Sequence, residues 1–373
     1  MGQPYISVIV TAYNRRKYLP FALRSLEAQT LLRDKFEVIV VKNFEDKESD
    51  DIISRNGWKD LYEDTTYHGR KILVGLEESK GDVITFLEDD DMYADNRLEE
   101  VYKAFTSYGR LVYFQNSQTI IDGNGNVLER PPLPTSKNLV GGSPLVIDIN
   151  KLQELAKRYE IDAADLVVRL RVRACFNSSS ESVRRSVLEA NAHLLKELPI
   201  GVDDFICASS LRTEGLIYFT DEKLTLYRVH GGNWSFDVNI ARSESIDMYL
   251  RRAKTFLYIT KVHKLIGSRL LNDHVNRYLC SERLDRGALL LLPLPELGVL
   301  PPELRLSLSD VKLALRCYMV EAIDLMNVAF IMGLAFLSPL LATPRGRLII
   351  GKLAEGIIKA LATKRALRRA RLR

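Results

Sequence analysis

The residues best suited to chemistry are four consecutive carboxylates, Glu88, Asp89, Asp90 and Asp91. They follow directly on Val83–Leu87, an apolar run that predicts a buried strand. Adjacent like charges repel one another, and several stay ionised together only when a cation lies among them. Oxygen ligands suit Mg²⁺ or Mn²⁺, which usually also bind substrate phosphates. The alternative is an acidic turn that caps a helix beginning near Asp95.

The elements that must position these carboxylates begin at the N-terminus. Ile6–Val10 predicts a strand, leucines at helical spacing over residues 19–26 predict a helix, and Phe36–Val41 predicts a second strand. A strand, loop, helix, strand order requires a parallel sheet, which binds ligands at the carboxyl ends of its strands. We therefore expect the loop at Thr11, the loop after Val41 and the acidic run to converge.

Arg70 and Lys71 precede a helical segment, Ile72–Glu78, for which Gly81 is the expected C-cap. Their positive charges could neutralise phosphates. An ordinary solvated basic pair is the alternative reading.

The middle of the chain predicts strands at Leu111–Gln115 and Ile120–Ile121, and then a Pro- and Gly-rich loop over residues 130–144, which could cover the site. Residues 151–195 are predicted to be mainly helical and to lie on the side of the site where a second, accepting substrate would bind.

Further candidates for the site follow this helical region. Asp203 and Asp204 lead into an apolar helix, and after a strand at Leu216–Thr220, His230 lies in the Gly-rich stretch YRVHGGNWS. A surface helix cap for Asp203 and a structural loop role for His230 are the alternatives.

With 373 residues, the chain is long enough for two domains, or for one large domain with an appendage. Its four cysteines, Cys175, Cys207, Cys280 and Cys317, are widely spaced and predict reduced thiols in a cytosolic or cytosol-facing protein. The opening residues, MGQPYISVIV, lack the basic region of a cleavable signal peptide, and their apolar run is too short for one.

Charge is concentrated at the C-terminus. Residues 345–373 hold ten Lys and Arg and a single acid, Glu355, whereas the whole chain has a net charge of +5. The basic character therefore belongs to a tail, which argues against a nucleic-acid-binding face on the main body.

Residues 5–236 resemble the family-2 nucleotide-sugar glycosyltransferases of the GT-A fold. Four motifs occur in the family's order: SVIVTAYNR, KGDVITFLEDDD in place of the DxD strand, an acidic pair at 203 and 204, and YRVHGGNWS. The resemblance implies an α/β fold with a mostly parallel sheet flanked by helices, and a helical, membrane-associating C-terminal region is expected to follow it.

By position, the resemblance also implies roles for individual residues. Asp204 would be the general base of an inverting reaction, with Asp203 beside it, and Asp90 the main ligand of Mg²⁺ or Mn²⁺. The other candidate metal ligands are Glu88, Asp91 and His230. The candidates for binding the nucleotide sugar are Thr11, Ala12, Tyr13, Arg15, Asn43, Lys71 and Asp89.

Two departures from the family pattern affect the expected donor and metal. The family usually has VDDGS after its second strand, with an Asp that contacts the base in uridine-nucleotide users, whereas this chain has Lys42 and Asn43. This favours GDP-mannose over a UDP-sugar as donor. Glu88 replaces the first aspartate of DxD, but the longer side chain can still reach a metal.

The last third predicts membrane association. Leu325–Ala342 is apolar and uncharged, and a basic amphipathic segment follows it. We expect a shallow or re-entrant helix, broken near Pro339, on the cytosolic face of a membrane; a full span, a buried core helix and an oligomer contact are the alternatives. The expected domains are residues 1–236 (transferase), 237–318 (helical) and 319–373 (apolar helix and basic tail).

The predicted function is transfer of a sugar from a nucleotide sugar to a lipid-linked or other membrane-proximal acceptor. A catalytically silent sugar-nucleotide-binding or assembly protein on the same fold is the alternative, as is a UDP-sugar-dependent transferase. A homodimer is conceivable.

Overall fold

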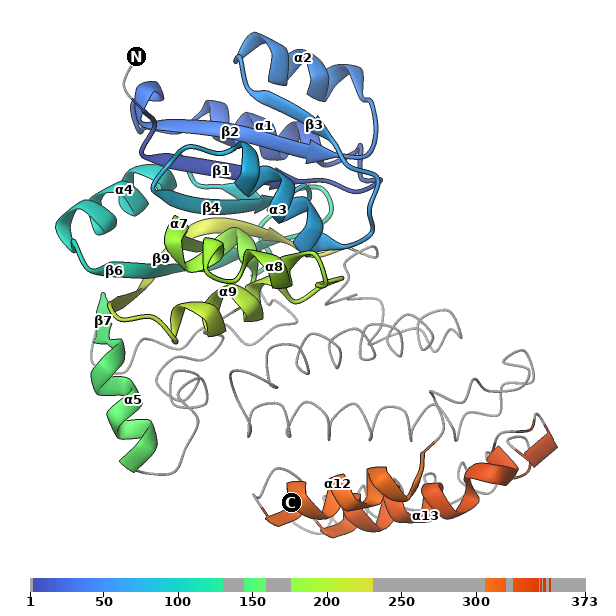
Figure 1. Cartoon of the computed structure of the whole chain (residues 1–373). Helices are drawn as coiled ribbons and strands as arrows, with labels where there is room; N and C mark the ends of the chain where they lie inside the picture. Colours follow the sequence, from blue (N-terminus) through green and yellow to red (C-terminus); the bar gives the residue numbers. More distant parts are fainter. Residues whose placement is uncertain are drawn as a thin grey trace, which may run out of the picture. The chain divides into compact units, whose positions relative to one another are not determined.

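The computed structural model describes residues 3–129, 144–158, 176–230, 306–319 and 325–341, together with positions 343, 345, 346 and 349. The chain divides into two compact units, Met1–Arg242 with Lys261–Asn272, and Ser243–Thr260 with Asp273–Arg373. The first unit contains the sheet and all the candidate site residues (Figure 1). The predicted domain limits at residues 236 and 318 stay predictions.

Within the described residues, nine strands form one mixed sheet in the order β3-β2-β1-β4-β8-β6-β9-β5, with β7 paired to β9. Their bounds are Ile6–Thr11 (β1), Phe36–Lys42 (β2), Lys59–Tyr62 (β3), Val83–Glu88 (β4), Met92–Tyr93 (β5), Leu111–Ile121 (β6), Leu145–Asp148 (β7), Glu181–Arg184 (β8) and Leu216–Arg228 (β9). The four strands β1 to β4 run parallel, whereas β8 is antiparallel to both β4 and β6. The predicted parallel arrangement of the N-terminal strands is confirmed.

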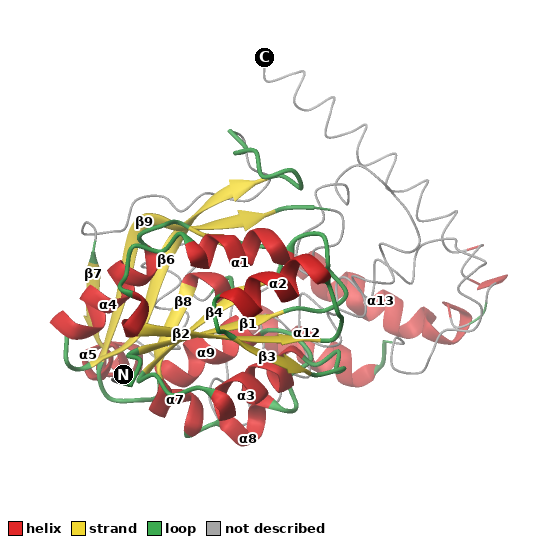
Figure 2. Ribbon diagram, turned by 90° about the horizontal axis from the view of Figure 1, so that it is seen from above, coloured by secondary structure: helices red, strands yellow, loops and turns green. Residues whose placement is uncertain are grey.

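Helices cover both faces of this sheet (Figure 2), which confirms the predicted α/β class. Their bounds are Leu19–Glu27 (α1), Lys47–Arg55 (α2), His68–Glu78 (α3), Arg97–Ser107 (α4), Ile149–Arg158 (α5), Arg185–Glu189 (α7), Ala192–Leu195 (α8) and Val202–Ser210 (α9). One face is covered by α1, α2 and α4, and the other by α3, α5, α7, α8 and α9.

β1 (ISVIVT) shows why its sequence is mostly apolar, with side chains buried on both faces of the sheet. Val8 and Val10 belong to the core on the side of α1, whereas Ile9 belongs to the core on the side of α3. Successive side chains of a strand point to opposite faces, so a strand covered on both faces has no place for a polar alternation.

Gly81 has a different role from the one predicted. α3 ends at Glu78 with Ser79 at its C-cap, so the predicted C-cap at Gly81 is wrong. A Cβ atom on Gly81 would lie 2.6 Å from the Ser7 nitrogen, and the Gly81 amide donates to Ser7 Oγ at 2.8 Å. The glycine is needed where the chain packs closely against β1 before it enters β4.

The described part of residues 151–195 is mainly helical, as predicted, and contains α5, α7, α8 and a short 3₁₀ turn, η2 (Ser178–Ser180). The prediction missed one strand in this range, β8, which lies in the centre of the sheet between β4 and β6. The sequence ESVR is too short and too polar to predict a central strand. The loop predicted over residues 130–144 lies almost wholly outside the described residues.

The cysteine prediction is wrong at one position. Cys207, on α9, is disulfide-bonded. Spacing along the chain could not predict this, because a disulfide depends on distance in space.

The second unit contains α12 (Leu308–Met319) and α13 (Leu325–Leu341), which confirms a helix in the apolar segment. The two helices contact one another through residues such as Val328 and Ile331 on α13 and Ala314 on α12. α13 includes Pro339 and continues to Leu341, so the predicted break near Pro339 is wrong. None of the helices in the described ranges has both the length and the apolar character needed to cross a membrane.

Arg97, at the start of α4, is fully buried in the first unit. Its guanidinium donates to Thr85 Oγ1 at 2.7 Å, to the Glu181 carbonyl at 3.2 Å and to Asn116 Oδ1 at 3.2 Å, and lies 3.9 Å from the centre of the Tyr93 ring. One side chain thus joins α4 to strands β4, β6 and β8. Because a buried charge is tolerated only when it is hydrogen-bonded, these contacts define one arrangement of helix and sheet.

We expect Arg97→Met to lower the free energy of unfolding by about 3 kcal/mol, because it leaves several buried acceptors without their donor. Arg110→Met is the matched control, since Arg110 has a 60% exposed side chain paired with Asp148 and should cost less than about 1 kcal/mol. Urea unfolding of the two variants measures the difference. Equal losses would show that the Arg97 contacts do not stabilise the sheet.

Candidate active site

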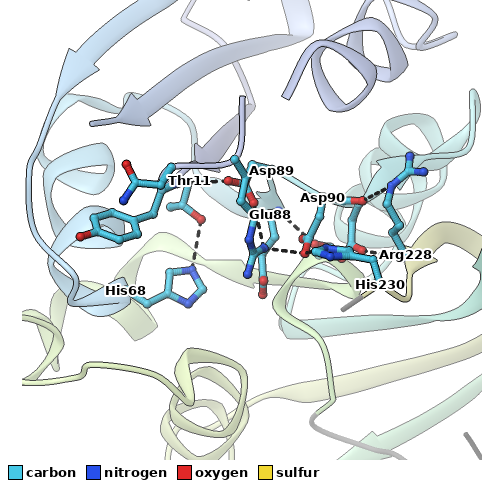
Figure 3. Close-up of polar contacts among 12 residues, drawn as sticks. Thr11, His68, Glu88, Asp89, Asp90, Arg228 and His230 are labelled. Carbon is cyan, nitrogen blue, oxygen red and sulfur yellow. Dashed lines mark hydrogen bonds and ion pairs between the residues drawn. The ribbon is translucent and has the colours of Figure 1, made fainter. Parts of the chain in front are cut away.

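The acidic run lies at the carboxyl end of β4, beside the end of β1 (Figure 3). Thr11 is paired with Glu88 in the parallel register, and its carbonyl accepts a 3.1 Å hydrogen bond from the Asp89 amide. Asp89, Asp90 and Asp91 are each at most 3% exposed. The predicted meeting of the two strand ends is confirmed, and the carboxylates are largely removed from solvent.

Two of the four carboxylates are held by donors from distant parts of the chain. Glu88 Oε1 accepts a 2.6 Å bond from Ser178 Oγ. Asp91 Oδ2 accepts from Asn177 Nδ2 at 2.9 Å, and its Oδ1 accepts from the Arg228 amide at 3.0 Å. Both side chains are therefore directed toward protein groups.

The helix-cap reading of the acidic run does not describe this structure. α4 begins at Arg97, with Asn96 at the N-cap position, and Asp91 lies several residues earlier. The short strand β5 lies between them and pairs with β9.

Arg15 joins the other two carboxylates. Its Nη1 atom is 3.0 Å from Asp89 Oδ1 and 2.5 Å from Asp90 Oδ2. The Tyr13 amide donates to Asp89 Oδ2 at 3.1 Å, and His230 Nε2 lies 3.0 Å from Asp90 Oδ2. The loop after β1 and the end of β9 thus meet at the acidic run, as Figure 3 shows for His230 and Asp90.

The pKa of Asp90 is shifted in the opposite direction from the pKa values of its three acidic neighbours. Burial raises the pKa of Asp89 and of Asp91 to about 7, and the charge of Asp90 adds to the rise. Burial also raises the pKa of Glu88 well above its ordinary value. For Asp90, burial is outweighed by Arg15 and His230, and its pKa is lowered. Asp90 is therefore the member of the run that stays ionised most readily.

The predicted nucleotide-binding residues lie along the ends of β1 and α3. Thr11 Oγ1 is 3.1 Å from His68 Nε2, and the Ala12 amide donates to the Val41 carbonyl at 2.9 Å. Lys71 Nζ lies 4.3 Å from the centre of the Tyr13 ring.

The two basic residues at the start of α3 differ in their surroundings. Burial lowers the pKa of Lys71 to about 8, and its ammonium also donates to the Thr65 carbonyl. Arg70 instead pairs with Glu63 at 3.3 Å and has a 42% exposed side chain. Of these two residues, therefore, Arg70 fits the alternative of an ordinary solvated basic residue, whereas the partly buried Lys71 does not.

Asn14 and Asn43 fix the conformation of the loop after β1. Asn14 has a positive φ of 57°, which asparagine tolerates better than most residues. Its amide donates to Asn43 Oδ1 at 3.0 Å, and Asn43 Nδ2 donates to Asn14 Oδ1 at 3.1 Å. Asn43 Nδ2 also lies 3.3 Å from Asp64 Oδ1, so a carboxylate lies beside Asn43 although Lys42 and Asn43 replace the aspartates of the family pattern.

The second acidic pair lies in the first turn of α9, behind Gly201, which has a φ of 74°. Burial raises the pKa of Asp203, and burial together with the charge of Asp203 raises the pKa of Asp204 well above its ordinary value. The Asn177 amide donates to Asp203 Oδ2 at 3.0 Å. Since Asn177 also donates to Asp91, a single residue contacts both acidic clusters.

The predicted set of four metal ligands does not come together. Across the described ranges, no three or more His, Cys, Asp or Glu side chains are grouped so as to hold a metal ion. Asp90 and His230 remain as a pair, because Glu88 and Asp91 point elsewhere. Mg²⁺ is commonly bound by one or two protein ligands together with substrate phosphates, so this pair fits such an ion chemically.

Several residues of the site were not predicted from the sequence. They are His68, Asp64, Tyr18, Asn177, Ser178, Ser179 and Arg228. Ser179 Oγ accepts from the Glu88 amide at 3.0 Å, and the Tyr18 ring lies 4.6 Å from the His230 ring, centre to centre. The run NSSSE at residues 177–181 was the available signal, because five small polar or acidic residues are unusual within a predicted helix.

The chain is similar in sequence to known glycosyltransferases. Residues 7–141 match the family model described as "Glycosyl transferase family 2". An uncharacterized glycosyltransferase of Nostoc sp. is 26% identical over 255 residues, which cover 64% of this chain and 69% of the relative. An uncharacterized glycosyltransferase of Haemophilus influenzae is 30% identical over 145 residues, which cover 37% of this chain and 56% of the relative.

Among solved structures, TarS residues 1–349 of S. aureus match with a TM-score of 0.51 and 14% identity, covering 95% of this chain and 92% of that one. The same part of TarS in complex with UDP-GlcNAc also gives a TM-score of 0.51, at 15% identity. At this level of identity the match concerns the fold. The family match itself covers residues 7–141, and the curated relatives that the chain resembles are glycosyltransferases.

Proposed function

We propose that this chain transfers a sugar from a nucleoside-diphosphate sugar to an acceptor hydroxyl, with inversion at the anomeric carbon. The observation that carries the proposal is the double contact of Asn177, which donates to Asp91 at 2.9 Å and to Asp203 at 3.0 Å. Asn177 is thereby hydrogen-bonded to one acid of the run Glu88–Asp91 and to one acid of the pair on α9. Inverting transfer needs charge stabilisation for the leaving diphosphate and a base for the acceptor around one reaction centre.

Asp204 is the proposed general base. Its pKa is raised well above the ordinary value, first by burial and then by Asp203. A carboxylate with a raised pKa is better matched to taking a proton from a hydroxyl near neutral pH. Asp203, which accepts a hydrogen bond from the Asn177 amide, would position the helical turn that holds Asp204.

Asp90 and His230 would hold Mg²⁺ or Mn²⁺, which when bound neutralises charge on the leaving diphosphate. The lowered pKa of Asp90, caused by Arg15 and His230, and the 3.0 Å contact between Asp90 and His230 support this assignment. Lys71, beside the Tyr13 ring, would add a positive charge to the nucleotide pocket formed with Thr11 and Ala12.

GDP-mannose is the favoured donor. The chain lacks the aspartates of the family pattern at the end of β2: Lys42, the last residue of the strand, pairs with Asp60 at 2.9 Å, and Asn43 follows it. Asn43 offers an amide that can both donate to and accept from a base.

A UDP-sugar is the alternative donor, and two observations favour it. Asp64 supplies a carboxylate 3.3 Å from Asn43 Nδ2. TarS, whose fold this chain shares, has been solved with UDP-GlcNAc bound.

The proposed acceptor is lipid-linked or membrane-proximal, and the proposed location is the cytoplasmic face of a membrane. α13 has five exposed large apolar side chains, Leu325, Met332, Phe336, Leu337 and Leu340. The strongly basic residues 345–373 follow this helix in the sequence. Exposed apolar side chains next to basic residues suit an anionic lipid surface.

Asp204→Asn should lower the rate of sugar transfer roughly 10²–10⁴-fold, because it removes the base, and should leave donor affinity unchanged. Asp203→Asn should retain measurable activity and move the acid limb of the pH–rate profile to lower pH, because it removes the like charge that raises the pKa of Asp204. Release of the nucleoside diphosphate, with a solubilised lipid extract as acceptor, measures both effects.

Asp148→Asn is the control, because Asp148 pairs with the exposed Arg110 and should leave the profile unaltered. Full activity in Asp204→Asn would refute the base assignment. Donor binding by the wild type without turnover on any acceptor would favour a silent binding protein.

Calorimetry in the presence of Mg²⁺ should show that the protein binds GDP and GDP-mannose at least about tenfold more tightly than UDP and UDP-GlcNAc. The reason is that guanine and uracil differ in the hydrogen bonds that they can form with the protein. A preference for UDP would overturn the donor proposal. Asp64→Asn should then lower UDP affinity, whereas Asp34→Asn, on the exposed η1 turn (Arg33–Lys35), should not.

Replacing Phe336 and Leu340 by Glu in the full chain should lower its binding to anionic vesicles at least about tenfold, because two large exposed apolar side chains are lost. Leu155→Glu, at an exposed leucine of α5, should leave vesicle binding unchanged. Co-sedimentation with phosphatidylglycerol vesicles measures the bound fraction. Equal binding by both variants would contradict attachment through α13.

A further inference from the structure

Arg15 has a contact pattern that its predicted role in nucleotide binding does not explain. A single atom, Nη1, lies 3.0 Å from Asp89 Oδ1 and 2.5 Å from Asp90 Oδ2. The two carboxylates are almost fully buried, with side chains 4% exposed, whereas the Arg15 side chain is 19% exposed. The guanidinium thus serves as one positive charge between two carboxylates at the edge of the buried cluster.

The oxygen that Arg15 contacts is the one that the proposed metal pair shares. Asp90 Oδ2 accepts from Arg15 Nη1 and also lies 3.0 Å from His230 Nε2. Mg²⁺ binds carboxylate oxygens at about 2.0–2.1 Å and is itself doubly positive, so it would be repelled by a guanidinium on the same oxygen. Arg15 and a divalent ion therefore compete for Asp90.

The backbone beside Arg15 is fixed by hydrogen bonds that do not involve the Arg15 side chain. Asn14 is bonded to Asn43 through two hydrogen bonds of 3.0 and 3.1 Å, and the Tyr13 amide is bonded to Asp89 at 3.1 Å. A change of partner for Arg15 can therefore occur by rotation of its long side chain while these hydrogen bonds stay in place. Arginine pairs well with phosphate oxygens, and a diphosphate would bring several to this edge of the cluster.

We infer that Arg15 is an exchangeable counter-ion: it neutralises Asp89 and Asp90 when no nucleotide is bound, and transfers to the diphosphate when a divalent cation takes its place at Asp90. This rests on the proposed function, because it assumes that a nucleoside diphosphate and a divalent cation bind at this site. The exchange keeps a positive charge on the carboxylates in both states, as a buried acidic cluster requires.

The exchange makes two predictions of opposite sign for Arg15→Gln. Without nucleotide, the variant should bind Mn²⁺ about tenfold more tightly than the wild type, because the competing charge is gone. With saturating Mn²⁺, it should bind the preferred nucleoside diphosphate about tenfold more weakly, because the phosphate contact is gone. Electron paramagnetic resonance of free Mn²⁺ and calorimetry with GDP and UDP measure the two affinities.

Arg24→Gln is the matched control, since Arg24 forms an exposed ion pair with Glu48 on the same unit and should change neither affinity. Arg15→Lys keeps the charge, so its Mn²⁺ affinity without nucleotide should equal that of the wild type; this variant serves if Arg15→Gln does not fold. Wild-type protein that binds neither GDP nor UDP would refute the proposed function, whereas the nucleotide-free Mn²⁺ measurement still tests the exchange. Unchanged Mn²⁺ affinity in Arg15→Gln, or tighter Mn²⁺ binding by Arg15→Lys than by the wild type, would overturn the inference.

Discussion

Glu88, Asp89, Asp90 and Asp91 carry up to four negative charges on adjacent residues at the end of a buried strand. Such a run is unfavourable unless each carboxylate finds a donor or a cation. The surrounding structure supplies them: the loop after β1 contributes Arg15 and the Tyr13 amide, and the end of β9 contributes the Arg228 amide and His230. The elements that meet at the site are those that compensate this charge.

The segment around η2 and β8 completes the compensation and links the two acidic clusters. Ser178 and Asn177 hold Glu88 and Asp91, while the Asn177 amide holds Asp203 on α9. This is possible because β8 inserts between β4 and β6, which brings the preceding residues to the end of β4. A change at η2 would therefore act on both the donor side and the acceptor side of the proposed reaction.

The sequence predicted the parts of the fold that depend on local pattern. Periodicity and the strand–helix–strand order are local properties, and the features that depend on them are as expected. These features are the strands β1, β2 and β4, the helices α1 and α9, and the meeting of β1 and β4 at their carboxyl ends. β8 was missed because four residues, ESVR, carry no periodic signal; only its neighbours in the sheet make it a strand. The disulfide at Cys207 was missed for a related reason, since it depends on distance in space.

For the site, residue types and motif order were enough to single out the acidic run, the pair at 203 and 204 and His230, because carboxylates in these positions resemble those of one family of transferases. Tertiary structure decided which of them remain available to a cation. Asp91 is bonded to Asn177 and Glu88 to Ser178, about 90 positions away, whereas Asp90 is paired with Arg15 and His230. The electrostatic state of a carboxylate depends on the groups within a few ångströms of it, and those groups come from segments whose proximity only the folded sheet creates.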